Sequence, residues 1–357
     1  MENYRIDSHK LMYHPKRVSA WLDGDVIYPI NAEISISGAC NHRCIFCSAD
    51  YMGYKAAFLP QEIVHSCFVQ MQSKGLKSVL FAGTGEPLLN RESADIINDT
   101  KKLGIDVALS TNGVLFTESV AEQCMESLSW VRFSVSAGTE ATYKRIHRGK
   151  DGDLERVFDN IYYAVRLKHK YHWKTVLGVQ IVMIPENENE IVLLAKKAKE
   201  LGVDHFSVKS YGVQPLNTNT VKERIDPQTY YDDRAQLIRR LDELNDVNFQ
   251  TIYRANRMQH GKEGKNYSEC YAMPFHVNID AQGNLWPCCV LVGMEGMCFG
   301  NIYEQSFEEI WNGDQRRHVV QKIKEMKLSE CAPECKLDAM NRYLHDLKYP
   351  NAHVNFI

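Results

Sequence analysis

Three cysteines within eight residues constrain this chain more than any other feature. Cys40, Cys44 and Cys47 follow the spacing Cys-x3-Cys-x2-Cys. A cubane of four irons needs four thiolates, so a run of three would leave one iron open to a ligand from outside the chain, as a catalytic zinc keeps one position open. A zinc ion completed by a distant fourth ligand, or cysteines that only pack, are the two simpler interpretations.

A short β-branched segment leads into these cysteines. Residues 33–37 read Glu-Ile-Ser-Ile-Ser, and Gly38 follows at the expected turn. The cysteines therefore lie on a loop that leaves the carboxyl end of a predicted strand. Because the loops at this end carry the chemistry in α/β barrels, we expect the functional site here.

Strand and helix patterns then alternate along the chain. The six predicted strands cover residues 33–37, 77–82, 106–110, 130–136, 176–184 and 205–211, with a helical segment after each of the first five. This alternation favours a parallel sheet with crossover helices. Six units are two fewer than in a closed eightfold barrel. We therefore predict an α/β fold, a partial (β/α)6 TIM-like barrel that stays open.

The alternation of strands and helices stops after Tyr211. A chain of 357 residues is long enough for a large domain and a smaller one. We expect four parts: an N-terminal lead-in (1–30), the partial barrel (31–225), a helical linker and loop (226–269) and a small cysteine-rich domain (270–357). In the linker, Asp226-Pro227 is a typical helix start, which predicts a helix to about Leu244. Residues 247–253 form a candidate extra strand.

Composition narrows the classes of function. The chain holds 11 cysteines, and its first residues, Met-Glu-Asn-Tyr-Arg-Ile-Asp, are too polar for a signal peptide. Cysteines in a protein without an export signal point to metal or redox use rather than disulfides. The formal net charge of −3 does not indicate a polyanionic partner, and no apolar run is long enough to span a bilayer. We expect a cytoplasmic protein with neither nucleic acid nor membrane as a partner.

The cysteine loop and the strands after it resemble the radical S-adenosylmethionine (SAM) enzymes. Gly85-Glu86-Pro87, at the end of the second predicted strand, resembles the Gly-Gly-Glu-Pro motif of that family, with Gly83-Thr84 before it. The resemblance covers residues 33–211. It implies that Cys40, Cys44 and Cys47 hold a [4Fe-4S] cluster whose open iron binds the amino and carboxylate groups of SAM.

The resemblance also implies a SAM site along the strand ends. Its residues would be Phe46 against the adenine, Gly83, Gly85, Glu86 and Pro87 around the ammonium, Ser110 and Asn112 at the ribose, Ser134, Ser136, Arg145 and Arg148 at the carboxylate, and Ile181 on the strand that supports the adenine. A glutamate suits an ammonium and an arginine suits a carboxylate. The alternatives are a core aromatic for Phe46 and a helix N-terminal carboxylate for Glu86.

The C-terminal cysteines resemble the SPASM/twitch extension of the same superfamily. Cys270-x17-Cys288 matches its opening pattern, and Cys331-x3-Cys335 supplies a closing pair. The resemblance implies one auxiliary [4Fe-4S] cluster on four thiolates, because the middle cysteine group of two-cluster members is missing. A structural zinc on the same four thiolates is the alternative. Cys289 is an alternative ligand to the adjacent Cys288.

The function implied is that of a radical SAM enzyme. It would cleave SAM reductively to a 5′-deoxyadenosyl radical and abstract a hydrogen from a small polar substrate, such as a sugar, an aminocyclitol or a sugar nucleotide. The auxiliary cluster would then assist an oxidation (dehydrogenation), and an external one-electron reductant such as flavodoxin or ferredoxin would supply the electron. A peptide-modifying maturase, a radical epimerase with Cys289 or Cys298 as hydrogen donor, and a non-catalytic iron–sulfur or zinc scaffold are the alternatives.

Overall fold

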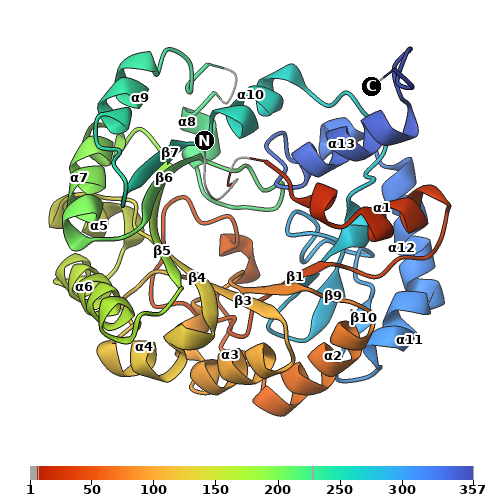
Figure 1. Cartoon of the computed structure of the whole chain (residues 1–357), viewed down its shortest axis with the longest axis horizontal. Coiled ribbons are helices and arrows are strands. Elements are labelled where there is room, and N and C mark those ends of the chain that lie inside the picture. The colour runs from red at the N-terminus through yellow and green to blue at the C-terminus, as the bar shows by residue number, and fades with distance from the viewer. Residues whose placement is uncertain (1–5, 7, 227–228, 357) are drawn as a thin grey trace.

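The strands of this protein form one continuous sheet. A computed structural model describes residue 6 and residues 8–226 and 229–356. Within these residues the sheet has ten strands in the order β10-β9-β8-β1-β2-β3-β4-β5-β6-β7 (Figure 1). The strands are β1 (Asn31–Ile34), β2 (Ser78–Phe81), β3 (Asp106–Thr111), β4 (Leu128–Ser134), β5 (Val176–Met183), β6 (His205–Ser210), β7 (Gln250–Tyr253), β8 (His276–Ile279), β9 (Asn284–Trp286) and β10 (Gly300–Asn301). Because β7 and β10 end the order unpaired with each other, the barrel is open, as predicted.

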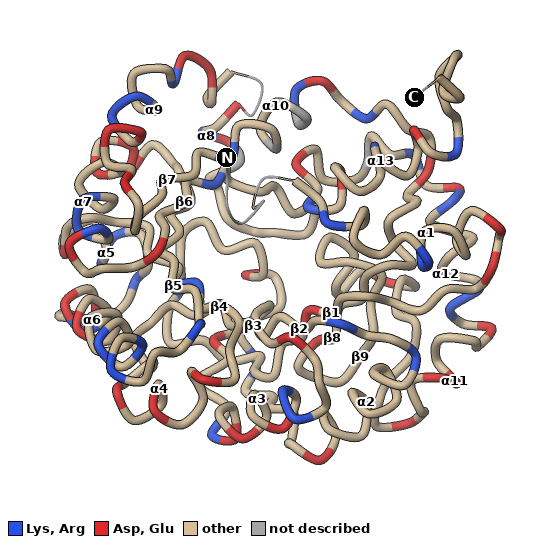
Figure 2. The backbone as a smooth tube through the Cα atoms, viewed as in Figure 1, with Lys and Arg blue, Asp and Glu red and all other residues tan. Residues whose placement is uncertain are grey.

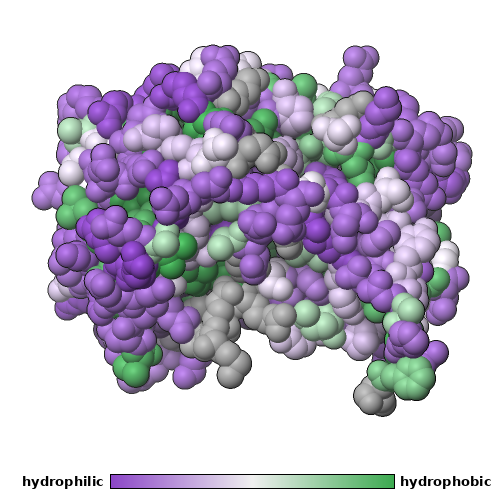
Figure 3. All heavy atoms as spheres, turned by 90° about the horizontal axis from the view of Figure 1, so that it is seen from above, coloured by the Kyte–Doolittle hydropathy of each residue, from purple (hydrophilic) through white to green (hydrophobic). Residues whose placement is uncertain are grey.

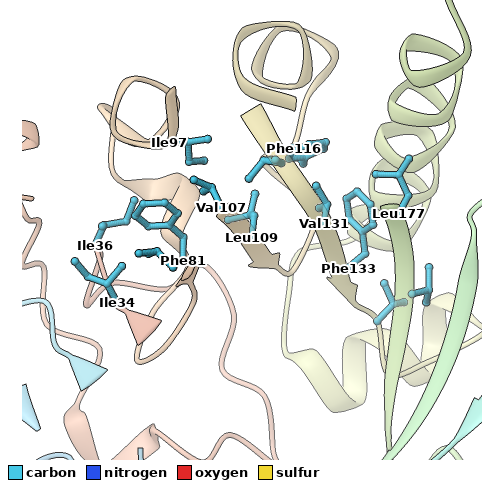
Figure 4. Packing of buried hydrophobic residues seen from close by; sticks show 14 of the residues in the cluster. Ile34, Ile36, Phe81, Ile97, Val107, Leu109, Phe116, Val131, Phe133 and Leu177 are labelled. Carbon is cyan, nitrogen blue, oxygen red and sulfur yellow. The ribbon is translucent and has the colours of Figure 1, made fainter. Parts of the chain in front are cut away.

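The first six strands overlap the predicted ones, although β1 and β4 each begin two residues earlier than predicted. All six are parallel to one another. A parallel strand is covered on both faces and is therefore almost continuously apolar. Strand β5 shows this, since six of its eight residues are buried. Figure 4 shows the resulting core, in which Phe81, Leu109 and Phe133 point from the strands toward the helices.

An arc of helices covers the outer face of the strands (Figure 1). These helices are α2 (Gln61–Ser73), α3 (Ser93–Lys102), α4 (Glu118–Cys124), α5 (Glu140–His147), α6 (Asp153–Tyr171) and α7 (Ile191–Leu201). Figure 2 shows charged residues of both signs along these helices, and the face seen in Figure 3 is mostly hydrophilic with small, scattered apolar patches. Among the described helices, none combines the length and apolar character needed to cross a membrane.

The linker after β6 is less helical than predicted. It contains α8 (Val221–Arg224), α9 (Ala235–Asp242) and α10 (Ala255–Glu263). The single helix predicted from Asp226 to Leu244 is wrong, because Asp233 has a φ of 50° and a helix cannot pass through that conformation; Pro227 itself lies outside the described residues. The predicted extra strand is confirmed as β7, which pairs in parallel with β6.

The cysteine-rich region continues the barrel sheet. Strand β8 pairs in parallel with β1, Asn31 opposite His276, and β9 and β10 follow in antiparallel order. The helices α11 (Phe307–Asn312), α12 (Asp314–Glu325) and α13 (Asp338–Lys348) cover this end. Short 3₁₀ turns complete the chain at Leu11–Tyr13, Asp50–Met52, Pro87–Leu89, Met125–Ser127, Glu188–Glu190, Met273–Phe275 and Leu328–Glu330.

The N-terminal helix α1 (Pro15–Leu22) packs on the C-terminal region (Figure 1). The ring of Trp21 contacts Tyr271 edge-on at 5.8 Å between centroids, and Val18 is buried in the same apolar cluster. Farther along, the indole of Trp311 donates to the carbonyl of Ile27 at 2.8 Å. The N-terminal segment thus fixes the C-terminal helices against the end of the sheet.

Candidate functional site

A cavity of about 340 Å³ lies among the strand ends and loops inside the sheet. On one side it is lined by Cys40, Cys44 and Cys47, and on another by Cys289 and Cys335. The first three cysteines are there because their loop leaves the carboxyl end of β1, where parallel strands place their functional loops. Two groups of thiols from opposite ends of the sequence therefore face one cavity.

The cysteine loop is held by backbone contacts on two sides. The amides of Arg43 and Ile45 donate to the carbonyls of His147 and Ile146, at 3.0 and 2.9 Å, at the end of α5. On the other side, a Cβ added to Gly85 would lie 2.3 Å from the carbonyl oxygen of Ala39. Only glycine allows this approach, which gives the Gly-Glu-Pro motif a structural reason.

The three thiols fit a metal cluster. Burial raises the pKa of Cys40 to about 11 and also raises the pKa of Cys47. Burial together with the neighbouring thiols raises the pKa of Cys44. Three crowded thiolates would repel one another without a cation, whereas iron offsets their charge and deprotonates them. The amide of His42 also donates to the sulfur of Cys40 at 3.4 Å, a contact that suits a thiolate.

Glu86 is buried beside this loop with one acceptor position left. Its carboxylate accepts from the hydroxyl of Thr111 and the amide of Asn112, both at 2.7 Å, and from the amide of Leu88 at 3.2 Å. A carboxylate offers about four lone-pair sites, so these three bonds leave one acceptor position on a residue that lines the cavity. Burial raises the pKa of Glu86 to about 6 despite these three hydrogen bonds. Glu86 also caps the 3₁₀ turn Pro87–Leu89 through the amide of Leu88, and this cap is compatible with a ligand at the remaining acceptor position.

Charged side chains line the interior wall of the cavity. They come from β1, β4, β6 and the C-terminal region: Glu33, Arg132, Lys209, Glu334 and Lys336. The ammonium of Lys336 lies 2.6 Å from the carboxylate of Glu33. Burial alone would raise the pKa of Glu33, but this pairing lowers it to about 2. The wall therefore suits a polar molecule.

The auxiliary cysteines line a second, smaller and largely apolar cavity. Cys270, Cys288, Cys331 and Cys335 meet there, among Tyr267, Met273, Leu291 and Ile323. Cys270 precedes β8 and Cys288 follows β9, so the antiparallel hairpin brings both to its open end. Four thiols with no carboxylate or imidazole among the described lining residues suit a fully ligated cubane.

Hydrogen bonds to sulfur and burial accompany this second thiol set. The amide of Leu337 donates to the sulfur of Cys335 at 3.3 Å, and burial raises the pKa of Cys270 to about 12. Cys289 faces the larger cavity, whereas Cys288 lies among the other three thiols. This arrangement favours Cys288 as the fourth ligand.

The structure brings most of the predicted site residues together. Besides the thiols, the larger cavity is lined by Phe46, Gly83, Gly85, Glu86, Ser110, Asn112, Ser134 and Ser136. Five predicted residues lie elsewhere: Pro87, Arg145, Arg148, Ile181 and Cys298. Ile181 is fully buried in the core, because Gln180 and Val182 occupy the inward positions of β5. The sulfur of Cys298 donates to the carbonyl of Gly300, in the β10 segment.

The two predicted arginines lie on the outer side of the cysteine loop. Arg145 and Arg148 line an open depression of about 660 Å³ together with Arg43 and Arg224. All four side chains are exposed, and Arg145 donates to the carbonyl of Glu186 at 3.0 Å. Cys44 lines the same depression, so a basic surface meets the cysteine loop from outside.

Several site residues were missed in the sequence. Arg132 alternates with buried residues on β4, so a period of two was the available signal there. Gln180 is one polar residue within the almost continuously buried strand β5, where no alternation marks it. Lys336 and His147 had no comparable signal, because they reach the site through tertiary contacts with Glu33 and Cys44.

Two family models match the chain. The model described as "Radical SAM superfamily" matches residues 34–198, and the SPASM model, "Iron-sulfur cluster-binding domain", matches residues 270–336. The first segment contains the cysteine loop and Glu86, and the second contains all four auxiliary cysteines.

Curated relatives match at low identity. The "Probable GTP 3',8-cyclase" of Methanocaldococcus jannaschii is 28% identical over 211 residues, 54% of this chain and 66% of the relative. The "AdoMet-dependent heme synthase" of Methanosarcina barkeri is 24% identical over 312 residues, 82% of this chain and 84% of the relative. The chain spans at most 66% of the length of the curated relatives that match it first.

Among solved structures, Streptococcus suis SuiB bound to the precursor peptide SuiA resembles the chain with a TM-score of 0.66. The identity is 17%, and the match covers 88% of this chain and 71% of SuiB. At this identity the likeness shows the fold alone.

Replacing Glu86 with glutamine should weaken SAM binding about tenfold or more, because a charge-assisted hydrogen bond contributes roughly 1.5–3 kcal/mol. Wild-type affinity should also fall as the pH drops below about 6, where the carboxyl of Glu86 protonates. Equilibrium dialysis of the iron-loaded protein measures both. Glu190→Gln, which alters a carboxylate that caps α5 outside the cavity, is the matched control. Equal affinity of Glu86→Gln and wild type would leave Glu86 only its capping role.

Anaerobically reconstituted protein should carry about eight irons per chain, from two four-iron clusters. Cys288→Ala should lower this to about four, since the auxiliary cluster loses one of its four thiolates and, unlike the SAM-site cluster, has no ligand from outside the chain to take its place. The adjacent Cys289→Ala should keep about eight. Elemental analysis measures the change. About four irons with one zinc in wild type would instead establish a structural zinc site.

Proposed function

This chain belongs to the radical SAM superfamily and carries a SPASM iron–sulfur domain, and we propose that it is an enzyme that dehydrogenates a small polar substrate. The observation that carries the proposal is the cavity of about 340 Å³ that contacts thiols of both ligand sets. A substrate held there would lie between the SAM cluster and the auxiliary cluster. It could lose a hydrogen atom toward one and an electron toward the other.

Cys40, Cys44 and Cys47 would hold the cluster that supplies the electron for SAM cleavage, so that the adenosyl group could take a hydrogen atom from the substrate. Cys270, Cys288, Cys331 and Cys335 would hold the cluster that could accept the electron left on the substrate, with the proton released to solvent. The chain supplies the geometry. Glu86 orients the SAM ammonium through its remaining acceptor position, and Phe46 offers a flat apolar surface to the adenine. The four thiolates would occupy every iron of the auxiliary cluster, so the substrate could not bind to that cluster directly. The chemistry that remains for the auxiliary cluster is electron transfer.

The wall of the cavity supports a small, polar substrate. Glu33 and Lys336 form an ion pair facing the cavity, and Arg132 and Lys209 come from neighbouring parts of the wall. Charged groups in a low-dielectric site discriminate strongly among polar ligands. Two relatives are named for nucleotide chemistry, a GTP 3',8-cyclase and a nucleotide dehydratase, and this supports a sugar or a sugar nucleotide.

Two other outcomes have specific support. A peptide substrate is supported by the fold likeness to SuiB bound to its precursor peptide. An epimerase reaction needs a hydrogen donor, and Cys289 lines the cavity, whereas Cys298 does not. Of Cys289 and Cys298, Cys289 is therefore the one with access to a substrate radical.

The exposed arginines beside Cys44 support docking of an acidic electron donor such as a flavodoxin or a ferredoxin. Arg43, Arg145, Arg148 and Arg224 share one depression with Asp50 and Glu186, so the basic groups outnumber the acidic ones. Such a surface raises the association rate of an acidic protein. Cys44 belongs to the same depression, which shortens the path of the electron.

The reaction type is tested by incubating reconstituted protein, SAM and a reductant with separate metabolite and peptide fractions of a cell extract in heavy water. We expect the metabolite fraction to stimulate release of 5′-deoxyadenosine and a product two hydrogens lighter, without deuterium at carbon. Stimulation by the peptide fraction alone would establish the maturase alternative. A product of unchanged composition with one carbon-bound deuterium, lost in Cys289→Ala but not in Cys298→Ala, would establish an epimerase.

Reversing two charges of the basic surface, Arg148→Glu with Arg224→Glu, should slow reduction by flavodoxin about tenfold at low salt and leave reduction by dithionite unchanged. The effect should shrink at high salt, because screening weakens long-range attraction. Stopped-flow absorbance follows both reactions. Arg166→Glu with Lys170→Glu, on exposed positions of α6, is the charge-matched control. Equal slowing in both variants would place docking elsewhere.

A further inference from the structure

His147 contacts the cysteine loop through its side chain as well as its backbone. It is the last residue of α5 and is 1% exposed. Its Nε2 lies 2.9 Å from the backbone nitrogen of Ser136, and its Nδ1 lies 3.2 Å from the sulfur of Cys44. The ring therefore bridges the end of β4 and one of the three cluster thiols.

The contact with Ser136 fixes the tautomer of this ring. A backbone N–H can only donate, so Nε2 must present its lone pair. With its lone pair on Nε2, the ring carries a single proton, which is on Nδ1. The Nδ1–H then points at the sulfur of Cys44 and donates to it.

The same argument excludes metal ligation by His147. Nitrogen atoms of His42 and His147 and the sulfur of Cys44 lie within 4.8 Å of one another, a spacing that a metal ion could bridge. Ligation through Nδ1 would require the proton on Nε2, where it would face the N–H of Ser136. A donor facing a donor is unfavourable in a buried site, so the ring acts toward the sulfur as a hydrogen-bond donor.

Packing holds the donor and its acceptor in place together. The ring of Tyr143 lies 4.3 Å from that of His147, and the ring of Phe46 meets it edge-on at 5.8 Å. The carbonyl of His147 also accepts from the amide of Arg43, next to Cys44 in the loop. His147 thus holds the cysteine loop through its backbone carbonyl and contacts the sulfur of Cys44 through its side chain.

We propose that His147 is a positioning residue that donates Nδ1–H to the Cys44 thiolate and thereby raises the reduction potential of the SAM-site cluster. Hydrogen bonds to cluster sulfurs raise the potential because they stabilise the more negative, reduced state. The proposal rests on a cluster at Cys40, Cys44 and Cys47 and is independent of the substrate and of the dehydrogenation.

Three substitutions separate the two hydrogen bonds. His147→Asn places an amide nitrogen near the position of Nδ1 and keeps a donor to Cys44. His147→Gln places its amide near Nε2 and keeps the partner of Ser136 only. His147→Phe keeps the ring and removes both bonds. Tyr143→Phe, which changes the neighbouring ring without touching the nitrogen–sulfur contact, is the control.

The readout is the midpoint potential of each cluster in the holoenzyme, followed by electron paramagnetic resonance during a redox titration. In the Gln and Phe variants the equilibrium constant for reducing the SAM-site cluster should fall about tenfold, which is about 59 mV for one electron. The Asn variant and Tyr143→Phe should stay near wild type, and the auxiliary cluster is an internal reference. Wild-type potentials in the Gln and Phe variants, or equal losses in Asn and Gln, would overturn the proposal.

A measurement on the wild-type chain covers the case in which the variants lose their cluster. Holoenzyme with histidine labelled by ¹⁵N at Nδ1 is reduced and studied by pulsed electron paramagnetic resonance in light and heavy water. A weak nitrogen coupling with an exchangeable proton supports the hydrogen bond. A strong coupling, typical of a directly bound nitrogen, or no coupling at all, would contradict it.

Discussion

Buried thiolate charge is the constraint on which this structure depends. Seven cysteines converge in two groups, and burial raises the pKa of most of them. Such groups are costly to ionise unless cations are present, and iron supplies the cation and the bond at once. The loop contacts at α5, the close approach at Gly85 and the hairpin β8–β9 hold these thiols in place. Cluster binding should therefore stabilise the folded state in both parts of the chain.

Much of the architecture could be predicted from local sequence. The six parallel strands and the partial barrel follow from alternating apolar runs and turns, and the extra strand β7 was visible as a short β-rich segment. The linker helix failed because Asp233 adopts a left-handed conformation that no pattern in the sequence marks. The parallel pairing of β8 with β1 also escaped prediction, since register between segments so far apart depends on tertiary packing.

The site shows the same division. The Cys-x3-Cys-x2-Cys spacing, Gly-Glu-Pro and the auxiliary cysteines are local motifs, and the structure gathers them at two cavities. Arg145 and Arg148 were assigned to the SAM carboxylate by resemblance, yet both lie on the outer surface of the loop. Their helix α5 turns one face to the core and the other to solvent, and only its last residue, His147, reaches the cavity. Composition does not reveal which side chains of such a short helix face the core and which face solvent.

Strand direction explains how two thiol groups come to share one cavity. The first group leaves the carboxyl end of β1, whereas the hairpin β8–β9 returns its open end, with Cys270 and Cys288, toward the amino end of that strand. Between the two ends, β1 presents Glu33, whose partner Lys336 directly follows the auxiliary ligand Cys335. The ion pair therefore links the wall of the cavity to the auxiliary site. In the proposed function, a substrate between the two groups would have to match this pair in charge. The contact that fixes the C-terminal segment would then also select what can bind.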